Sequence, residues 1–167
     1  MQRTPSLMFD VTVLRRPEID GFLPSRAFEV DITEEAVIKI SHCDKHFICA
    51  FVDGEVPLKI LPATQGIRYA KLQTFMNHGP IVQALGGEGR CETSLVNIFL
   101  LLLKQGNGQP GVLLRNGLGN CFYSLDRRDT LRAIRIIWDA GGWNISSFSM
   151  DLRQGWHAGY QVFGRAA

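Results

Sequence analysis

The C-terminal third of the chain has the clearest pattern of apolar and polar positions. Four stretches there are rich in β-branched and aromatic residues: 122–125, 131–138, 143–150 and 160–163. Segments containing Asp and Gly separate them, and short loops of this composition join neighbouring antiparallel strands. The pattern predicts an antiparallel β-meander over residues 111–167.

Alternation within 131–138 assigns its side chains to the two faces of the predicted strand. Arg132 and Trp138 share one face, and Arg135 belongs to the other, each among apolar neighbours. Such a strand fits a sheet covered on one side and partly open on the other. If 139–142 is a loop, Trp138 and Trp143 face each other across the ladder as an aromatic pair.

The middle of the chain has helical periods. Residues 94–104 are apolar around almost the whole circumference, Thr93 or Ser94 can cap their start, and Gly106 is a typical stop. This pattern predicts a central buried helix. Apolar positions at helical spacing in 69–76 and in 81–85 predict two further helices that meet at the breaker 78–80.

The N-terminal part alternates short apolar runs with turn residues. Strands are expected at 9–14, 28–32, 37–40, 47–52 and 56–60. The length of 167 residues, with 46% hydrophobic and 20% charged residues, is typical of one globular domain. The predicted fold is therefore a single α+β domain over 1–167. Its mixed α/β part, 1–110, surrounds the buried helix at about 94–104, and the antiparallel meander part follows over 111–167.

Cysteine usage and the hydropathy profile favour a cytoplasmic protein. Cys43, Cys49, Cys91 and Cys121 lie in or beside apolar stretches, and their low density is that of free thiols in a reducing compartment. The first ten residues lack the continuous apolar region of a signal peptide. The longest apolar run, 95–103, is about half of the ~20 residues that span a bilayer. We expect no membrane partner.

The C-terminal part is unusual in its charges and aromatic residues. It holds seven Arg, no Lys and four Asp, a net charge of +3 in a chain whose net charge is only +2, and it contains all three Trp. Arg and Trp are enriched at protein–protein hot spots. We therefore expect a non-enzymatic accessory or inhibitory interaction module that binds a macromolecular partner, a protein, through this sheet. The expected partner-binding residues are Arg127, Arg128, Arg132, Arg135, Trp138, Trp143 and Trp156.

Two other interpretations of these Arg and Trp residues stay open. The arginines are also compatible with a solubilising face. Aromatic rings on a sheet can stack on bases while Arg meets phosphate, so single-stranded nucleic-acid binding is a further alternative. The small net charge and the division of the Arg residues between faces favour a protein over a nucleic acid.

An enzymatic alternative centres on Cys91, at the predicted start of the buried helix. A thiol at a helix N-terminus has a lowered pKa. A nucleophilic cysteine there, followed by antiparallel strands, resembles the architecture of papain-like and transglutaminase-like cysteine enzymes. That resemblance implies a hydrolase or transferase with a base after the cysteine, a position that only His157 fits. The preceding His78, with Glu88 and Glu92 nearby, is the other candidate base. The chain departs from those families because no Asp or Asn follows His157.

The segment 42–49 has the composition of a metal site. His42, Cys43, His46 and Cys49 are ligand types that zinc prefers, but structural zinc sites draw on two separated ligand pairs, and no second pair occurs. Phosphate-binding glycine loops and serine-hydrolase motifs are absent from the sequence as well. We predict no metal and no cofactor, and the sequence leaves the oligomeric state open.

Overall fold

The computed structural model describes residues 7–15, 22–53, 64–151 and 153–166, and its centre is a mixed seven-stranded sheet. The strand order is β1-β3-β9-β5-β6-β7-β2, and all neighbours are antiparallel except β5–β9 and β2–β7. The strands are β1 (Asp10–Arg15), β2 (Ile40–Cys43), β3 (Thr64–Lys71), β5 (Asn120–Leu125), β6 (Leu131–Asp139), β7 (Gly142–Ser149) and β9 (Gln161–Arg165). A separate antiparallel pair consists of β4 (Met76–Asn77) and β8 (Gly155–Trp156).

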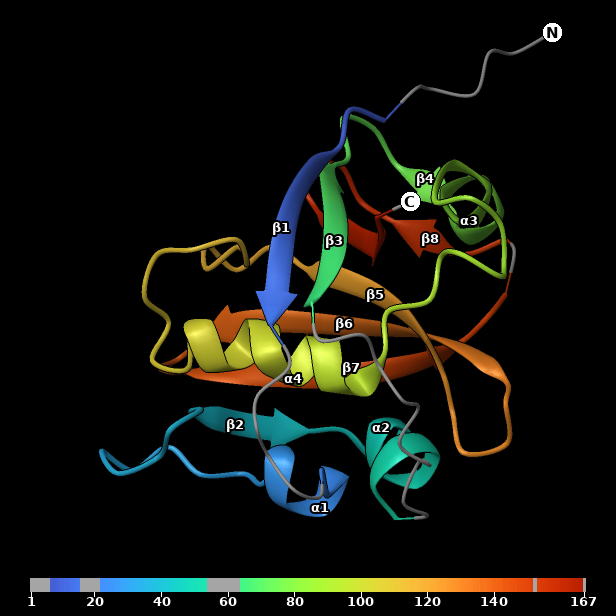
Figure 1. Ribbon diagram of the computed structural model, residues 1–167. Coiled ribbons are helices and arrows are strands. Elements are labelled where there is room, and N and C mark those ends of the chain that lie inside the picture. The colour runs from blue at the N-terminus through green and yellow to red at the C-terminus, as the bar shows by residue number, and fades with distance from the viewer. Residues whose placement is uncertain (1–6, 16–21, 54–63, 152, 167) are drawn as a thin grey trace, which may run out of the picture.

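Helices pack on both faces of this sheet (Figure 1). They are α1 (Pro24–Ala27), α2 (Lys45–Phe47), the π-helix η1 (Ile48–Val52), α3 (His78–Ala84) and α4 (Leu95–Lys104). One hydrophobic cluster joins one face of the sheet to α1, α2, η1 and α4. A second cluster joins the other face to α3 and to the β4–β8 pair. None of the helices in the described ranges is long and apolar enough to cross a bilayer.

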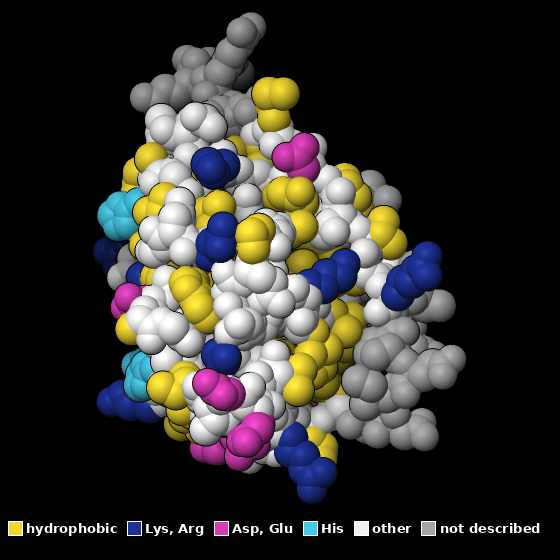
Figure 2. Space-filling model, turned by 90° about the vertical axis from the view of Figure 1, so that its left-hand side faces the viewer, with side chains coloured by type: hydrophobic (Ala, Val, Ile, Leu, Met, Phe, Trp, Pro, Cys, Tyr) yellow, Lys and Arg dark blue, Asp and Glu magenta, His cyan; other side chains and the backbone are white. Residues whose placement is uncertain are grey.

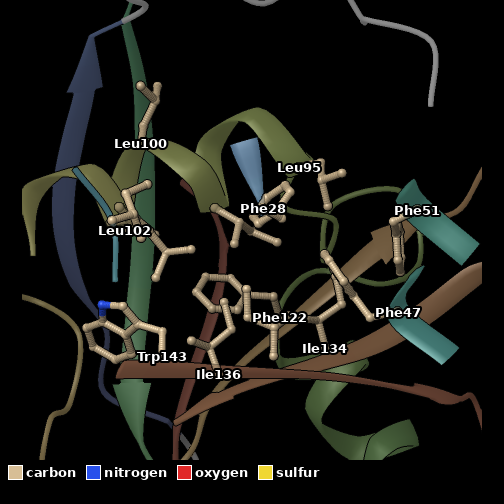
Figure 3. Close-up of a cluster of buried hydrophobic side chains, with 14 of the residues drawn as sticks. Phe28, Phe47, Phe51, Leu95, Leu100, Leu102, Phe122, Ile134, Ile136 and Trp143 are labelled. Carbon is tan, nitrogen blue, oxygen red and sulfur yellow. The ribbon is translucent and has the colours of Figure 1, made fainter. Parts of the chain in front are cut away.

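The longest helix, α4, begins at a capped end and supplies much of the first cluster. The Ser94 hydroxyl accepts the Asn97 N–H, which satisfies one of the free amides of the first turn. Every residue of α4 except Lys104 is buried or half-buried. Figure 3 shows its leucines above Phe122, Ile134 and Trp143, which project from the sheet.

Two expected elements are wrong because apolar runs were assigned the wrong period. Residues 47–52, expected as a strand, form the end of α2 and all of η1. The Asp44 side chain accepts the Phe47 N–H at 2.8 Å, which starts the helix, and Phe47 and Phe51, four residues apart, pack at 5.3 Å. The expected helix over 69–76 does not form: residues 69–71 end β3, which pairs with both β1 and β9, residues 72–75 are irregular, and Met76 begins β4.

The C-terminal strands depart from a simple meander. Strands β5, β6 and β7 follow one another in antiparallel pairs, but β8 pairs with β4 and β9 returns to lie parallel to β5. The expected strand at 28–32 is reduced to one bridge between Asp31 and Ile40, and the strand expected at 37–40 begins at Ile40. The strand expected at 56–60 lies outside the described residues.

Candidate functional site

The loop between β5 and β6 is organised around the carboxylate of Asp126, which is 4% exposed. One of its oxygens, Oδ1, accepts the backbone N–H groups of Arg128 at 2.8 Å and Thr130 at 3.0 Å. The other, Oδ2, accepts the Arg132 Nε–H at 2.8 Å. The Asp126 N–H also donates to the Thr130 carbonyl across the loop. These bonds fix the backbone that carries three arginines.

The environment of Asp126 keeps its carboxylate charged. Burial by itself raises the pKa of this group, but the hydrogen bonds from Arg132 and from the amides of Thr130 and Arg128 outweigh burial and hold the pKa below its usual value. The carboxylate is therefore an anionic anchor at neutral pH. The side chains of the next two residues, Arg127 and Arg128, are exposed at the surface of the loop.

The loop closes a pocket against α2 and η1. The Arg127 N–H donates to the Ala50 carbonyl of η1 at 3.3 Å, which ties the two segments together. Between them is a pocket of about 170 Å³. The described residues that line it are His46, Cys49, Ala50, Asp126, Arg127, Arg128 and Arg132. Three guanidinium groups against one carboxylate give this lining a formal charge of +2 with neutral histidine.

The chemistry of this pocket is that of an anion site. Guanidinium groups donate paired N–H bonds to carboxylates and phosphates, and such charge-assisted bonds are among the strongest in proteins. The Arg132 side chain is 30% exposed and already bound to Asp126 through Nε, whereas Arg127 and Arg128 make no side-chain hydrogen bond to any described residue. Within the described ranges, these two guanidinium groups keep their N–H donors free for an incoming anion.

The seven residues expected to bind a partner do not share one surface. Trp143 is fully buried and its Nε1–H donates to the Gln105 carbonyl at 3.0 Å. Trp156 is 5% exposed and belongs to the cluster on the other face of the sheet. Trp138 faces Trp143 across β6 and β7, as its spacing predicted, and the rings pack edge to face at 5.1 Å. These indole rings serve packing within the protein.

The arginines are also divided by the strand. Arg135 lies on the opposite face from Arg132, with its guanidinium over the Phe148 ring at 5.1 Å. Trp138 is six residues along β6 from Arg132, about 20 Å at the usual rise of a strand. The structure therefore brings together Arg127, Arg128 and Arg132. The partner-binding role of all seven residues stays a prediction.

Cys91 is not at a helix N-terminus. It lies in the turn before Ser94, which caps α4, and it is fully buried. Its Sγ is 3.7 Å from the Glu88 carbonyl. Burial is the largest influence and raises the pKa of the Cys91 thiol to about 11, with further increases from Glu88 and Glu92. A thiol in this environment is protonated at neutral pH, which disfavours a role as nucleophile.

The two histidines suggested as its base lie in different surroundings. Nδ1 of His78 is 2.9 Å from the Tyr123 hydroxyl, which also accepts the Trp156 Nε1–H at 3.1 Å. Burial lowers the pKa of His78, against the opposing influence of Asp151. The direction of the bond between Nδ1 and the phenol depends on the imidazole tautomer, since the hydroxyl oxygen can accept from two groups and can also donate its proton. His78 is thus committed to a buried network, and the cysteine-enzyme alternative stays an untested prediction.

His157 is exposed and packs beside Phe75 and Tyr160, with ring separations of 5.8 and 5.7 Å. No hydrogen bond links it to Cys91 within the part of the chain that the structure describes.

The two cysteines of segment 42–49 lie in different environments. Cys43 is buried in β2, where its thiol donates to the Phe28 carbonyl and burial raises its pKa to about 12. Cys49 is exposed on η1. Across the described ranges, no three His, Cys, Asp or Glu side chains gather as a metal site requires.

Comparisons of the chain with protein-family models, curated proteins and solved structures find no match in any of the three. The site is therefore assigned from its geometry alone. Sequence reasoning identified its arginines but missed His46, Cys49 and the anchoring role of Asp126. The signal for Asp126 was present, since an Asp at the start of a tight loop commonly accepts the amides that follow it.

Proposed function

We propose that this chain is a non-enzymatic accessory or inhibitory module whose protein partner places an acidic group in the pocket lined by Arg127, Arg128 and Arg132. The observation that carries the proposal is that three arginines line one hollow and that the buried Asp126 carboxylate fixes the backbone of their loop. A preorganised loop loses little conformational freedom when an anion binds.

The surroundings of the pocket favour an acidic protein over a nucleic acid. Binding of single strands combines cations with exposed aromatic rings on which bases stack. No Phe, Tyr or Trp is among the described residues that line this pocket, where the only ring is the imidazole of His46. Trp143 and Trp156 are buried, and Trp138 is at the far end of β6. A carboxylate from an Asp or Glu side chain requires only the donors that are present.

The proposal also assigns a role to the rest of the fold. The β5–β6–β7 meander, backed by α4 as the buried helix, acts as the rigid support that presents the loop. A cytoplasmic location belongs to the same proposal, and it is supported by the four cysteines, all of which are free thiols.

Charge reversal of the two exposed arginines tests this proposal. The double variant Arg127→Glu/Arg128→Glu is expected to bind a fluorescein-labelled glutamate-rich peptide about ten-fold more weakly than the unmodified protein, because two attractive charge pairs become repulsive. Fluorescence anisotropy at low ionic strength measures the affinity. The melting temperature is expected to stay nearly constant because both side chains are exposed.

The matched control is Arg90→Glu/Lys104→Glu, which makes the same change in net charge at two exposed positions outside the pocket. This control should retain the affinity of the unmodified protein to within about two-fold. An equal loss in both double variants would show that net charge alone attracts the peptide and would overturn the proposal. Tighter binding of a single-stranded oligonucleotide than of the peptide, sensitive to the same arginines, would favour the nucleic-acid alternative instead.

A further inference from the structure

A second hollow lies between α1, α4 and the segment that leads into β2. It is an open groove of about 440 Å³, within the size range of ligand-binding pockets. Its apolar lining includes Phe22, Phe99, Leu103 and Ile38, and Leu23 and Val37 stand at its margin with 37% and 74% exposure. The ring centroids of Phe22 and Phe99 are 5.4 Å apart, so an aromatic contact joins the segment before α1 to α4.

The wall that carries Val37 is held firmly against the end of α4. The Lys39 N–H donates to the Gly106 carbonyl at 2.7 Å. A Cβ at Gly106 would lie 1.9 Å from the Val37 carbonyl oxygen, so only glycine permits this approach. Backbone contacts therefore hold this wall of the groove in place.

The polar groups of the groove are mainly acidic. Among the described residues, Glu29, Asp31 and Glu35 line it together with one cation, Arg26. No ion pair among the described residues joins Arg26 to any of these carboxylates. The described lining residues therefore have a formal charge of −2, in a chain whose net charge is +2. Figure 2 shows acidic side chains gathered low on this side of the molecule, close to hydrophobic ones.

We propose that this groove binds an amphipathic basic segment of a partner protein, with apolar side chains against Phe22 and Phe99 and Lys or Arg side chains beside Glu29 and Glu35. An apolar groove is the usual receptor for an amphipathic helix, which docks through residues spaced i, i+3, i+4 and i+7. The acidic lining selects the sign of the flanking charges, because like charges at an interface disfavour binding. The site is separate from the arginine pocket and opposite to it in charge.

The test uses two labelled peptides that differ only in charge. Both carry leucines at i, i+3, i+4 and i+7, one with lysines and the other with glutamates on the polar face. Fluorescence anisotropy is expected to show tighter binding of the lysine peptide. Glu29→Gln/Glu35→Gln should weaken its binding about five-fold through the loss of two exposed charge pairs, and Val37→Lys should weaken it about ten-fold or more.

Matched controls lie next to the groove and elsewhere on the surface. Glu34→Gln removes a neighbouring exposed carboxylate that does not line the groove, and Val13→Lys makes the Val37 change at another exposed valine. Both should retain the affinity of the unmodified protein to within about two-fold. Equal binding of the two peptides, equal losses in test and control variants, or no binding of either peptide would each overturn the proposal. Binding of a small lipophilic cation without binding of the lysine peptide would overturn it too and would assign the groove to a small ligand.

Discussion

Replacing Trp143 with alanine is expected to lower the free energy of unfolding by about 4 kcal/mol. The side chain is fully buried in the cluster between the sheet and α4, and its Nε1–H satisfies the Gln105 carbonyl at the C-terminal end of that helix. Truncation would leave a large cavity and would remove one of the two hydrogen bonds that this carbonyl accepts, the other coming from the Gly108 N–H at 2.9 Å. Chemical denaturation, followed by far-UV circular dichroism because the substitution removes a fluorophore, measures the change.

Two further variants separate the contributions of Trp143. Trp143→Phe keeps an aromatic ring but loses the indole N–H, and we expect a smaller loss of about 1–2 kcal/mol. Trp138→Ala removes the partly exposed ring that packs on Trp143 and should also have a smaller effect than Trp143→Ala. A stable Trp143→Ala variant that fails to bind the glutamate-rich peptide would contradict the purely structural role assigned here to this ring.

Replacing Asp126 with alanine is expected to lower the free energy of unfolding by about 2–3 kcal/mol. The substitution removes the acceptor of two backbone amides and of the Arg132 guanidinium. These three part-buried hydrogen bonds go to a charged group, and such bonds contribute more than an average hydrogen bond. The figure is below that for a fully buried ion pair because Arg132 is 30% exposed and its charge is screened by water. Thermal and urea denaturation measure it.

Asp129→Asn is the matched control, since Asp129 is an exposed residue of the same loop. Its φ of 56° is a conformation that Asn adopts readily, so its stability should change little. Loss of stability at Asp129 equal to that at Asp126 would contradict the anchoring role. Asp126→Ala should also weaken binding of the glutamate-rich peptide, because the loop that orients Arg127 and Arg128 would no longer be fixed.

The contribution of Asp126 to the free energy of unfolding should decrease as the pH falls. Its pKa in the folded protein is below the ordinary value of 3.8, so the unfolded chain takes up a proton first as the pH falls. The stabilisation is therefore fully present above about pH 5 and is lost as the pH falls through 3.8 toward the folded-state pKa. The stability difference between the unmodified protein and Asp126→Asn should shrink over that range.

Local patterns predicted the parts of the fold in which neighbours in sequence are also neighbours in space. The pairing of Trp138 with Trp143 follows from a short loop between two strands, and the placement of Arg132 and Arg135 on opposite faces follows from strand alternation. The start of α4 follows from Ser94, whose side chain caps the helix. These features depend on a few adjacent residues.

Features that depend on distant parts of the chain could not be predicted in this way. The parallel pairing of β9 with β5 joins segments about forty residues apart, and nothing in either strand specifies it. Phe47 and Phe51 fit a helix as well as an apolar strand, and the capping bond of Asp44 decides between them. The arginine pocket could not be predicted either, because it forms only where η1 meets the β5–β6 loop.

The most direct test of the arginine pocket uses Cys49, which lines it and is the one exposed cysteine of the four. Its alkylation by iodoacetamide is followed by peptide mass spectrometry, with and without saturating glutamate-rich peptide. We predict that the peptide slows alkylation of Cys49 several-fold in the unmodified protein and has no such effect in Arg127→Glu/Arg128→Glu. An unchanged rate at Cys49 while the peptide is bound would show that the acidic group docks elsewhere, and the proposed function would be wrong.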